Sequence, residues 1–141
     1  MRKLLVLAAL AVAFAGPAQA EGDAELGEKV FRKCKACHMV GEDARTKAGP
    51  ELNNIIGATA GTKPDFARKY SDAMVEAGKG GLVWNTATLD PYLEKPRKFL
   101  KGTRMTFAGL RNAEERANVI AYLAQFSEPA DTGPEHSGAA D

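Results

Sequence analysis

Apolar residues recur at helical spacing in two stretches near opposite ends of the 141-residue chain. Over residues 23–34 they fall four apart, which predicts an amphipathic helix with Asp23 as its N-cap. Residues 112–126, NAEERANVIAYLAQF, carry the clearest apolar stripe of the chain. Asn112 and Glu115 have the spacing of a capping box at its start. The pattern therefore predicts a first and a last helix that each offer an apolar face.

Two shorter helices are expected between them. One covers residues 71–77 and ends at Gly78, and the other covers residues 85–94. Pro91 falls inside the second and should kink it or delay its start, because proline cannot donate the helical hydrogen bond. Residues 41–61 are rich in loop-forming residues, and the sequence has no alternating strand pattern of useful length. We expect an all-α domain whose long loops pack on a large apolar ligand.

The first twenty residues have the features of a secretory signal peptide. A basic pair precedes a short apolar run, which ends in the small-x-small sequence AQA. The run is too short for a membrane-spanning helix, and this disfavours a membrane anchor. We expect cleavage after Ala20 and export, most simply to a bacterial periplasm. The sequence thus divides into a leader (residues 1–20), one domain (residues 21–127) and a flexible acidic tail (residues 128–141).

Charge changes the picture only in the kind of partner that it favours. The chain has 19 basic and 18 acidic residues, and removal of the leader takes away two basic ones, which leaves a net charge of −1. The tail holds four acidic residues and no Lys or Arg, so residues 21–127 carry 17 basic and 14 acidic groups. A nearly neutral exported chain is not typical of a nucleic-acid-binding protein.

The most specific chemistry lies in RKCKACHMV, residues 32–40. It holds the only two cysteines, Cys34 and Cys37, followed at once by His38. A disulfide here would close too small a loop to stabilise much, and a redox dithiol belongs in a β/α chain. Zinc needs about four ligands, and the only other histidine, His136, lies in the tail. The pattern favours covalent attachment of one haem c, with His38 as an iron ligand.

Four methionines compete for the opposite side of the iron. Met1 leaves with the leader, and Met39 follows His38 too closely to reach the other face. Met74 falls in an expected helix, where packing explains it. Met105 lies in a polar loop bracketed by glycines, where packing alone does not explain a methionine. We expect Met105 to be the second axial ligand, and a thioether there favours electron transfer.

From Gly27 to Phe126 the chain resembles class I c-type cytochromes, the group of mitochondrial cytochrome c and bacterial cytochrome c2. The matching segments occur in the family order: GEKVFRKCKACH, AGPEL, YSDAM, the single Trp84, TLDPYLEKPRKFLKGTRMTFAGL and EERANVIAYL. The resemblance implies the cytochrome c fold, in which about five short helices and long loops wrap around one covalently bound haem. It also implies that the first and last helices cross, with Gly27 allowing their close approach.

The resemblance assigns roles to individual residues. Cys34 and Cys37 become the thioether anchors, and His38 and Met105 become the axial ligands. In the implied haem environment, the Pro50 carbonyl supports the histidine. Tyr70 and Trp84 are donors near a propionate. Tyr92 and Thr103 steady the methionine.

Three positions depart from the family pattern. The family often has an arginine where this chain has Ala58, and an asparagine where it has Met74. Both changes remove a polar group from the haem surroundings and are expected to affect the reduction potential. Pro91 is the third departure, and its consequence is not evident from the sequence.

These observations predict a one-electron carrier and not an enzyme. With both axial positions filled from the protein, no substrate site remains at the iron. The family implies a soluble, monomeric carrier between a cytochrome bc complex and a terminal oxidase or photosynthetic reaction centre. Two alternatives stay open, namely a peroxide- or gas-binding haem protein and a dedicated donor to a periplasmic reductase or peroxidase. The resemblance also implies a ring of basic residues around one apolar side chain, where acidic faces of the redox partners would dock: Lys33, Arg97, Lys98, Arg104 and Arg111 around Phe107.

Overall fold

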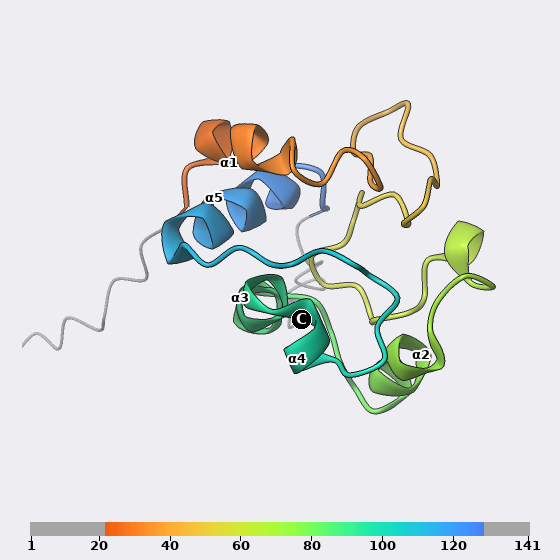
Figure 1. The fold of residues 1–141 in the computed structure, drawn as a ribbon. Coiled ribbons are helices and arrows are strands. Elements are labelled where there is room, and N and C mark those ends of the chain that lie inside the picture. The colour runs from red at the N-terminus through yellow and green to blue at the C-terminus, as the bar shows by residue number, and fades with distance from the viewer. Residues whose placement is uncertain (1–21, 129–141) are drawn as a thin grey trace, which may run out of the picture.

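The structure, a computed structural model, describes residues 22–128. The expected leader and all but the first residue of the expected tail lie outside the described residues. The elements in chain order are α1 (Ala24–Phe31), the 3-10 turn η1 (Pro64–Phe66), α2 (Asp72–Lys79), α3 (Thr86–Glu94), α4 (Pro96–Phe99) and α5 (Ala113–Ala124) (Figure 1). The only β pairing within residues 22–128 is an isolated bridge between Thr59 and Val83. The all-α prediction is confirmed.

Helices α1 and α5 lie near opposite ends of the described chain and pack against each other (Figure 1). A β-carbon on Gly27 would lie 1.9 Å from the Asn118 carbonyl oxygen, so only glycine permits this approach. The rings of Phe31 and Tyr122 lie 5.3 Å apart between centroids, and Phe31 is only 1% exposed. The crossing expected from the resemblance is therefore present, and it closes the chain around a shared core.

The helix ends differ from the predicted ones for local reasons. Helix α1 stops at Phe31, and the chain continues through turns to Cys37. Helix α2 runs through Gly78 to Lys79, and a β-carbon on Gly78 would lie 1.9 Å from the Ala60 carbonyl oxygen. That glycine serves close packing and does not end the helix. The turn η1 and helix α4 were not predicted, since three or four residues are too short to show a period.

The capping box lies at α3 and not at α5. Asn85 accepts a hydrogen bond from the Thr88 backbone N–H at 3.1 Å, and the Thr88 hydroxyl accepts one from the Asn85 N–H at 3.0 Å. At α5 the Asn112 side chain does cap the helix, but Glu115 pairs with Lys33 of the other terminal helix region at 2.7 Å. The carboxylate predicted to complete a local cap instead links the two ends of the domain.

Helix α3 tolerates its proline. It begins at Thr86 and runs through Pro91 to Glu94, so the proline does not delay its start. Lys95 then separates α3 from α4, whose first residue is Pro96. At the first position of a helix the backbone N–H has no partner within the helix, so a proline there costs no hydrogen bond. None of the helices in residues 22–128 has the length and apolar character needed to cross a membrane.

Candidate functional site

The core of the domain encloses one large, mostly apolar cavity of about 440 Å³. Its walls come from α1, the long loops, α2, α3 and α5. Cys34, Cys37, His38 and Met105, which lie up to 71 residues apart, all line it. The cavity therefore brings together the four residues that the sequence singled out.

The His38 side chain is fixed by a backbone carbonyl. Its Nδ1 atom lies 2.7 Å from the Pro50 oxygen, so Nδ1 carries the proton and donates it, which leaves the lone pair on Nε2. Burial lowers the pKa of His38, and the Pro50 contact opposes this only in part. The neutral imidazole is thus favoured, and this is the form that can bind a metal.

Gly49 explains how the backbone comes so close to this ring. A β-carbon at Gly49 would lie 2.4 Å from Cε1 of His38. Gly49 does not have a positive φ, so crowding and not backbone conformation requires glycine there. The sequence suggested only a glycine-rich loop, because the reason for this glycine is a ring eleven residues away.

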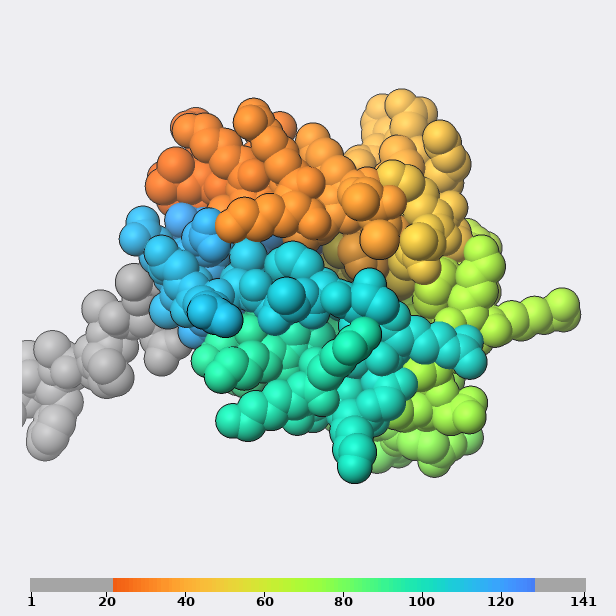
Figure 2. All heavy atoms as spheres, viewed as in Figure 1, coloured from red at the N-terminus to blue at the C-terminus, as the bar shows by residue number. Residues whose placement is uncertain are grey.

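Met105 lies in the connection between α4 and α5, in a segment that we call the Met105 loop (residues 101–109). In Figure 2 this segment crosses the visible face between the orange N-terminal part and the green helices. The Tyr92 hydroxyl donates a hydrogen bond to the Met105 Sδ at 3.3 Å and lies 3.4 Å from Thr103 Oγ1. Thr103 Oγ1 in turn accepts from the Met105 backbone N–H at 3.3 Å. Tyr92 and Thr103 thus contact the methionine that they were expected to steady.

The two cysteines are not joined in a disulfide and have different surroundings. Burial raises the pKa of Cys34 to about 11, so its thiol stays protonated at neutral pH, while Cys37 is exposed. A protonated thiol is a poor nucleophile, and it must lose its proton before it can bind zinc. Within residues 22–128 there is no group of three or more His, Cys, Asp or Glu side chains that could hold a metal ion. His136 lies outside the described residues.

Aromatic side chains form part of the cavity wall. Trp84 and Tyr92 are each 5% exposed, and their ring centroids lie 4.8 Å apart. Tyr70 also lines the cavity and packs edge-on against Phe66 at 4.9 Å. Met74 is buried and also lines this cavity, and its expected role in packing stays a prediction. These rings supply the apolar surface that a large flat cofactor needs.

The expected docking residues divide into two groups. Lys33, Arg104 and Phe107 line the edge of the cavity. Arg97 and Lys98, on α4, and Arg111, before α5, are exposed but do not line it. Two of the cations already have partners, because Lys33 pairs with Glu115 and Arg104 Nη1 donates to the Lys69 carbonyl at 3.0 Å.

Two buried polar residues were missed by sequence reasoning. Arg116 on α5 is 8% exposed and bonds Asp90 of α3 through Nε at 2.7 Å. Its Nη1 also donates to the carbonyls of Leu110 and Arg111. Asn118 accepts from the Asp23 backbone N–H at 2.7 Å and so joins α5 to the start of α1. Asp90 and Asp23 lie 26 and 95 residues away from their partners in sequence, and only the fold reveals these contacts.

The residues that line the cavity fit a haem. The cavity is large and apolar, one neutral imidazole and one thioether line it, and two thiols lie next to the imidazole in sequence. That donor set is typical of haem iron and not of a zinc site.

Comparisons with known proteins agree with this chemistry. The Cytochrome c family model matches residues 24–127. Cytochrome c2 of Rhodomicrobium vannielii is 46% identical over 120 residues, which cover 85% of this chain and 92% of that protein. Cytochrome c2 of Agrobacterium tumefaciens is 48% identical over 113 residues, which cover 79% of this chain and 100% of that protein.

Solved structures give the same result. The structure of cytochrome c2 from Rhodospirillum centenum matches with a TM-score of 0.70 at 42% identity, over 76% of this chain and 100% of that one. Cytochrome c2 from Rhodobacter sphaeroides matches with a TM-score of 0.70 at 37% identity, over 77% and 100%. The chain is therefore an electron-transfer protein with one covalently attached haem c, and it belongs to the cytochrome c family, in the class I cytochrome c2 group.

Proposed function

We propose that Cys34 and Cys37 anchor the haem through thioethers and that His38 Nε2 and Met105 Sδ are its two axial ligands. The observation that carries this proposal is that all four residues line one cavity. The Pro50 carbonyl occupies Nδ1 of His38, which leaves Nε2 as the free donor atom. The Tyr92 hydroxyl uses one lone pair of the Met105 sulfur and leaves the other.

When bound, the haem iron alternates between Fe(III) and Fe(II) and so carries one electron. The protein keeps both ligands in place during this change, because each one is held by a hydrogen bond to a second residue. The buried rings of Trp84 and Tyr92 give this part of the cavity an apolar wall. With both ligand positions supplied by the chain, a carrier is favoured over a peroxide- or gas-binding protein.

The haem surroundings of this chain differ from the usual family pattern. Tyr70 and Trp84 remain candidates for donors to a propionate, and their place in the cavity lining supports this. Ala58 and Met74 offer no polar group where relatives often have one, and Met74 is buried in the lining. We expect a propionate that depends on these two donors more than in those relatives.

We propose that electrons enter and leave at the edge of the cavity lined by Lys33, Arg104 and Phe107. The described domain carries more basic than acidic residues, which favours acidic partner surfaces. The partners proposed are a cytochrome bc complex on one side and a terminal oxidase or photosynthetic reaction centre on the other. The setting proposed is the periplasm, where the monomer acts after removal of the leader behind Ala20. The remaining members of the docking ring are Arg97, Lys98 and Arg111.

The optical spectrum of the oxidised holoprotein tests the ligand assignment. We expect a low-spin spectrum with the weak long-wavelength band of methionine on Fe(III). Met105→Ala should abolish this band and lower the reduction potential by on the order of a few tenths of a volt, since axial ligands set haem potentials over a wide range. Met39→Ala is the matched control and should keep the band. A high-spin spectrum of the unmodified protein would instead favour the ligand-binding alternative.

A further inference from the structure

The segment that carries His38 is paired residue by residue with the segment that carries Pro50. We call this pair the His38 clasp, residues 37–41 and 49–53. Gly49 N–H donates to the Cys37 carbonyl and Leu52 N–H to the Met39 carbonyl, both at 2.9 Å. The Asn53 side chain then bonds both the N–H and the carbonyl of Gly41, each at 2.8 Å. The His38–Pro50 contact lies in the middle of this pairing, so its geometry depends on the whole clasp.

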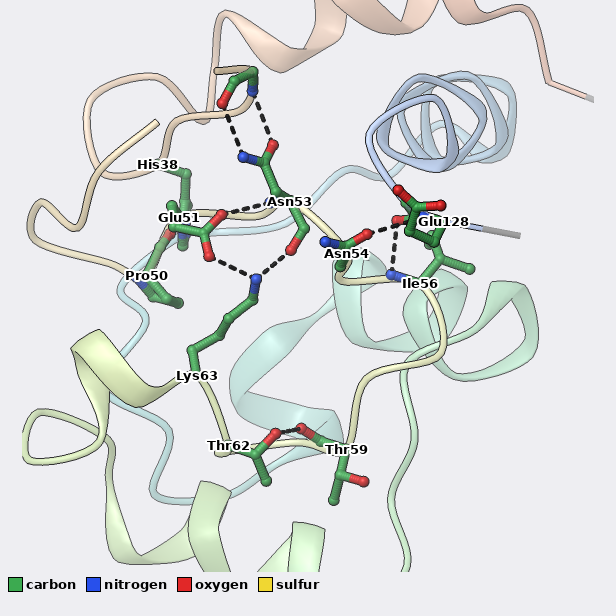
Figure 3. Close-up of polar contacts among 12 residues, drawn as sticks. His38, Pro50, Glu51, Asn53, Asn54, Ile56, Thr59, Thr62, Lys63 and Glu128 are labelled. Atoms are coloured by element: carbon green, nitrogen blue, oxygen red, sulfur yellow. Dashed lines mark hydrogen bonds and ion pairs between the residues drawn. The ribbon is translucent and has the colours of Figure 1, made fainter. Parts of the chain in front are cut away.

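The Glu51 side chain makes contacts that lead away from the first segment. Its Oε1 accepts a hydrogen bond from Lys63 Nζ at 2.6 Å, and its Oε2 accepts from the Asn53 backbone N–H at 2.8 Å. Lys63 Nζ also donates to the backbone oxygen of Asn53. Figure 3 shows Lys63 reaching from its own loop to both groups, on the opposite side of the segment from the Asn53 amide. One ammonium group thus holds the outer edge of the clasp at two points.

This ion pair is well shielded from solvent. The side chains of Lys63 and Glu51 are 16% and 20% exposed, whereas those of Lys79 and Glu76, an ion pair on α2, are 67% and 68% exposed. Removal of one partner from a shielded, hydrogen-bonded pair leaves the other charge without compensation, while an exposed pair contributes little. The two pairs join the same residue types at nearly the same distance, so the α2 pair is a natural control.

We infer that Lys63 and Glu51 are positioning residues for the haem ligand. They hold residues 51–53 against the loop that begins after Gly61, and through these residues they keep the Pro50 carbonyl on the Nδ1–H of His38. The inference rests on the proposed function, in which His38 Nε2 binds the iron. A histidine whose second N–H is donated to a carbonyl is more basic and favours the oxidised metal. Loosening the clasp should therefore weaken this contact and raise the reduction potential.

Amide hydrogen exchange of the full-length holoprotein tests the inference directly. In Lys63→Met and in Glu51→Gln we expect exchange at the Gly49 and Leu52 amides to rise about tenfold, because the clasp opens more often. Lys79→Met and Glu76→Gln should leave these amides unchanged. The double variant Lys63→Met/Glu51→Gln leaves the net charge unchanged, so a rise of its reduction potential that Lys79→Met/Glu76→Gln does not show would report the loosened clasp. If Lys63→Met does not yield folded protein, Lys63→Arg, which keeps the charge, should show exchange close to that of the unmodified chain.

A double-mutant cycle separates the pair from its individual residues. The effects of Lys63→Met and Glu51→Gln on exchange should be strongly non-additive, because each removes the same interaction. Exchange at Gly49 and Leu52 equal to that of the Lys79→Met control would overturn the inference. If the proposed ligand assignment itself is wrong, the optical spectrum of the unmodified protein shows it, independently of the exchange measurements. In that case the exchange result still reports whether the pair holds the clasp, and an unchanged exchange still refutes it.

Discussion

The two sides of the haem cavity are built in different ways. On one side, five hydrogen bonds join the two segments of the His38 clasp: two link backbone to backbone, and three link the His38 or Asn53 side chain to the backbone of the other segment. On the other side, side-chain atoms make most of the contacts that hold the Met105 loop, from Tyr92, Thr103 and Arg104. A paired backbone opens only when several bonds break together, whereas a single side-chain contact is lost alone. The comparison predicts a rigid histidine side and a more easily displaced methionine side.

The largest effect is expected from crowding the rigid side. In Gly49→Ala the new β-carbon would meet Cε1 of His38 at 2.4 Å, so either the ring or the clasp must move. Overpacking of this kind costs about 1–3 kcal/mol. We expect the unfolding free energy to fall by that amount, as measured by denaturant titration, together with a lower yield of low-spin holoprotein.

Gly80→Ala is the control for this substitution. Its β-carbon would meet its nearest neighbours at 3.4 Å, which is ordinary contact, and its φ of −76° suits any residue. Equal losses of stability in the two variants would show that the clasp can adjust as easily as an exposed turn. The proposed contrast between the two sides would then be wrong.

The sequence predicts the chemistry of this site better than its supports. Cys34, Cys37 and His38 are adjacent, so their spacing alone indicates haem attachment, and Met105 could be found by eliminating three other methionines. The role of Gly49 could not be found, because it depends on the orientation of the His38 ring. In the same way, helices with a clear period were located to within a few residues, while the four-residue α4 was missed.

Supports between distant segments were missed for a related reason. Arg116 and Asn118 read as ordinary polar positions of an amphipathic helix, yet both are buried because their partners come from α3 and from the start of α1. The capping box was assigned to Asn112, where Glu115 has the right spacing, but Glu115 pairs with Lys33 instead. A local rule gives the residues that can cap, and the tertiary fold decides which of them do.

A smaller effect is expected from the Tyr92 hydroxyl on the methionine side. Tyr92→Phe keeps the ring packed on Trp84 and removes only the contacts to Met105 and Thr103. We expect a loss of about 1 kcal/mol at pH 7. The Met105 band should also disappear at a lower pH than in the unmodified protein, as followed in an optical titration. Tyr122→Phe, which removes a hydroxyl from the α1–α5 contact, should leave the band unchanged.

The same variant has a distinct dependence on pH. Burial raises the pKa of Tyr92 above its usual value of 10.0, although the Thr103 contact acts in the opposite direction. The unfolded chain therefore releases this proton first, and the stability that the neutral tyrosine contributes is complete below pH 10 and falls as the pH rises further. The stability difference between Tyr92→Phe and the unmodified protein should shrink above pH 10 in denaturant titrations. A constant difference would show that Tyr92 ionises equally well in both states.

The smallest effect is expected where the methionine side meets the docking surface. Arg104 precedes Met105 and donates to the Lys69 carbonyl at 3.0 Å, so this side chain both holds the loop and contributes charge. Arg104→Gln and Arg111→Gln each remove one positive charge from the proposed docking ring. Both should slow reduction by an acidic partner about twofold at low ionic strength, and salt should remove the difference from the unmodified protein.

Only Arg104→Gln should also destabilise the Met105 loop, by at most about 1 kcal/mol, since the bond to Lys69 is exposed. In an optical pH titration, Arg104→Gln should lose the Met105 band at a lower pH than the unmodified protein. If both variants lose the band at the same pH, the Arg104 contact does not hold the loop, and the methionine side depends on Tyr92 and Thr103 alone.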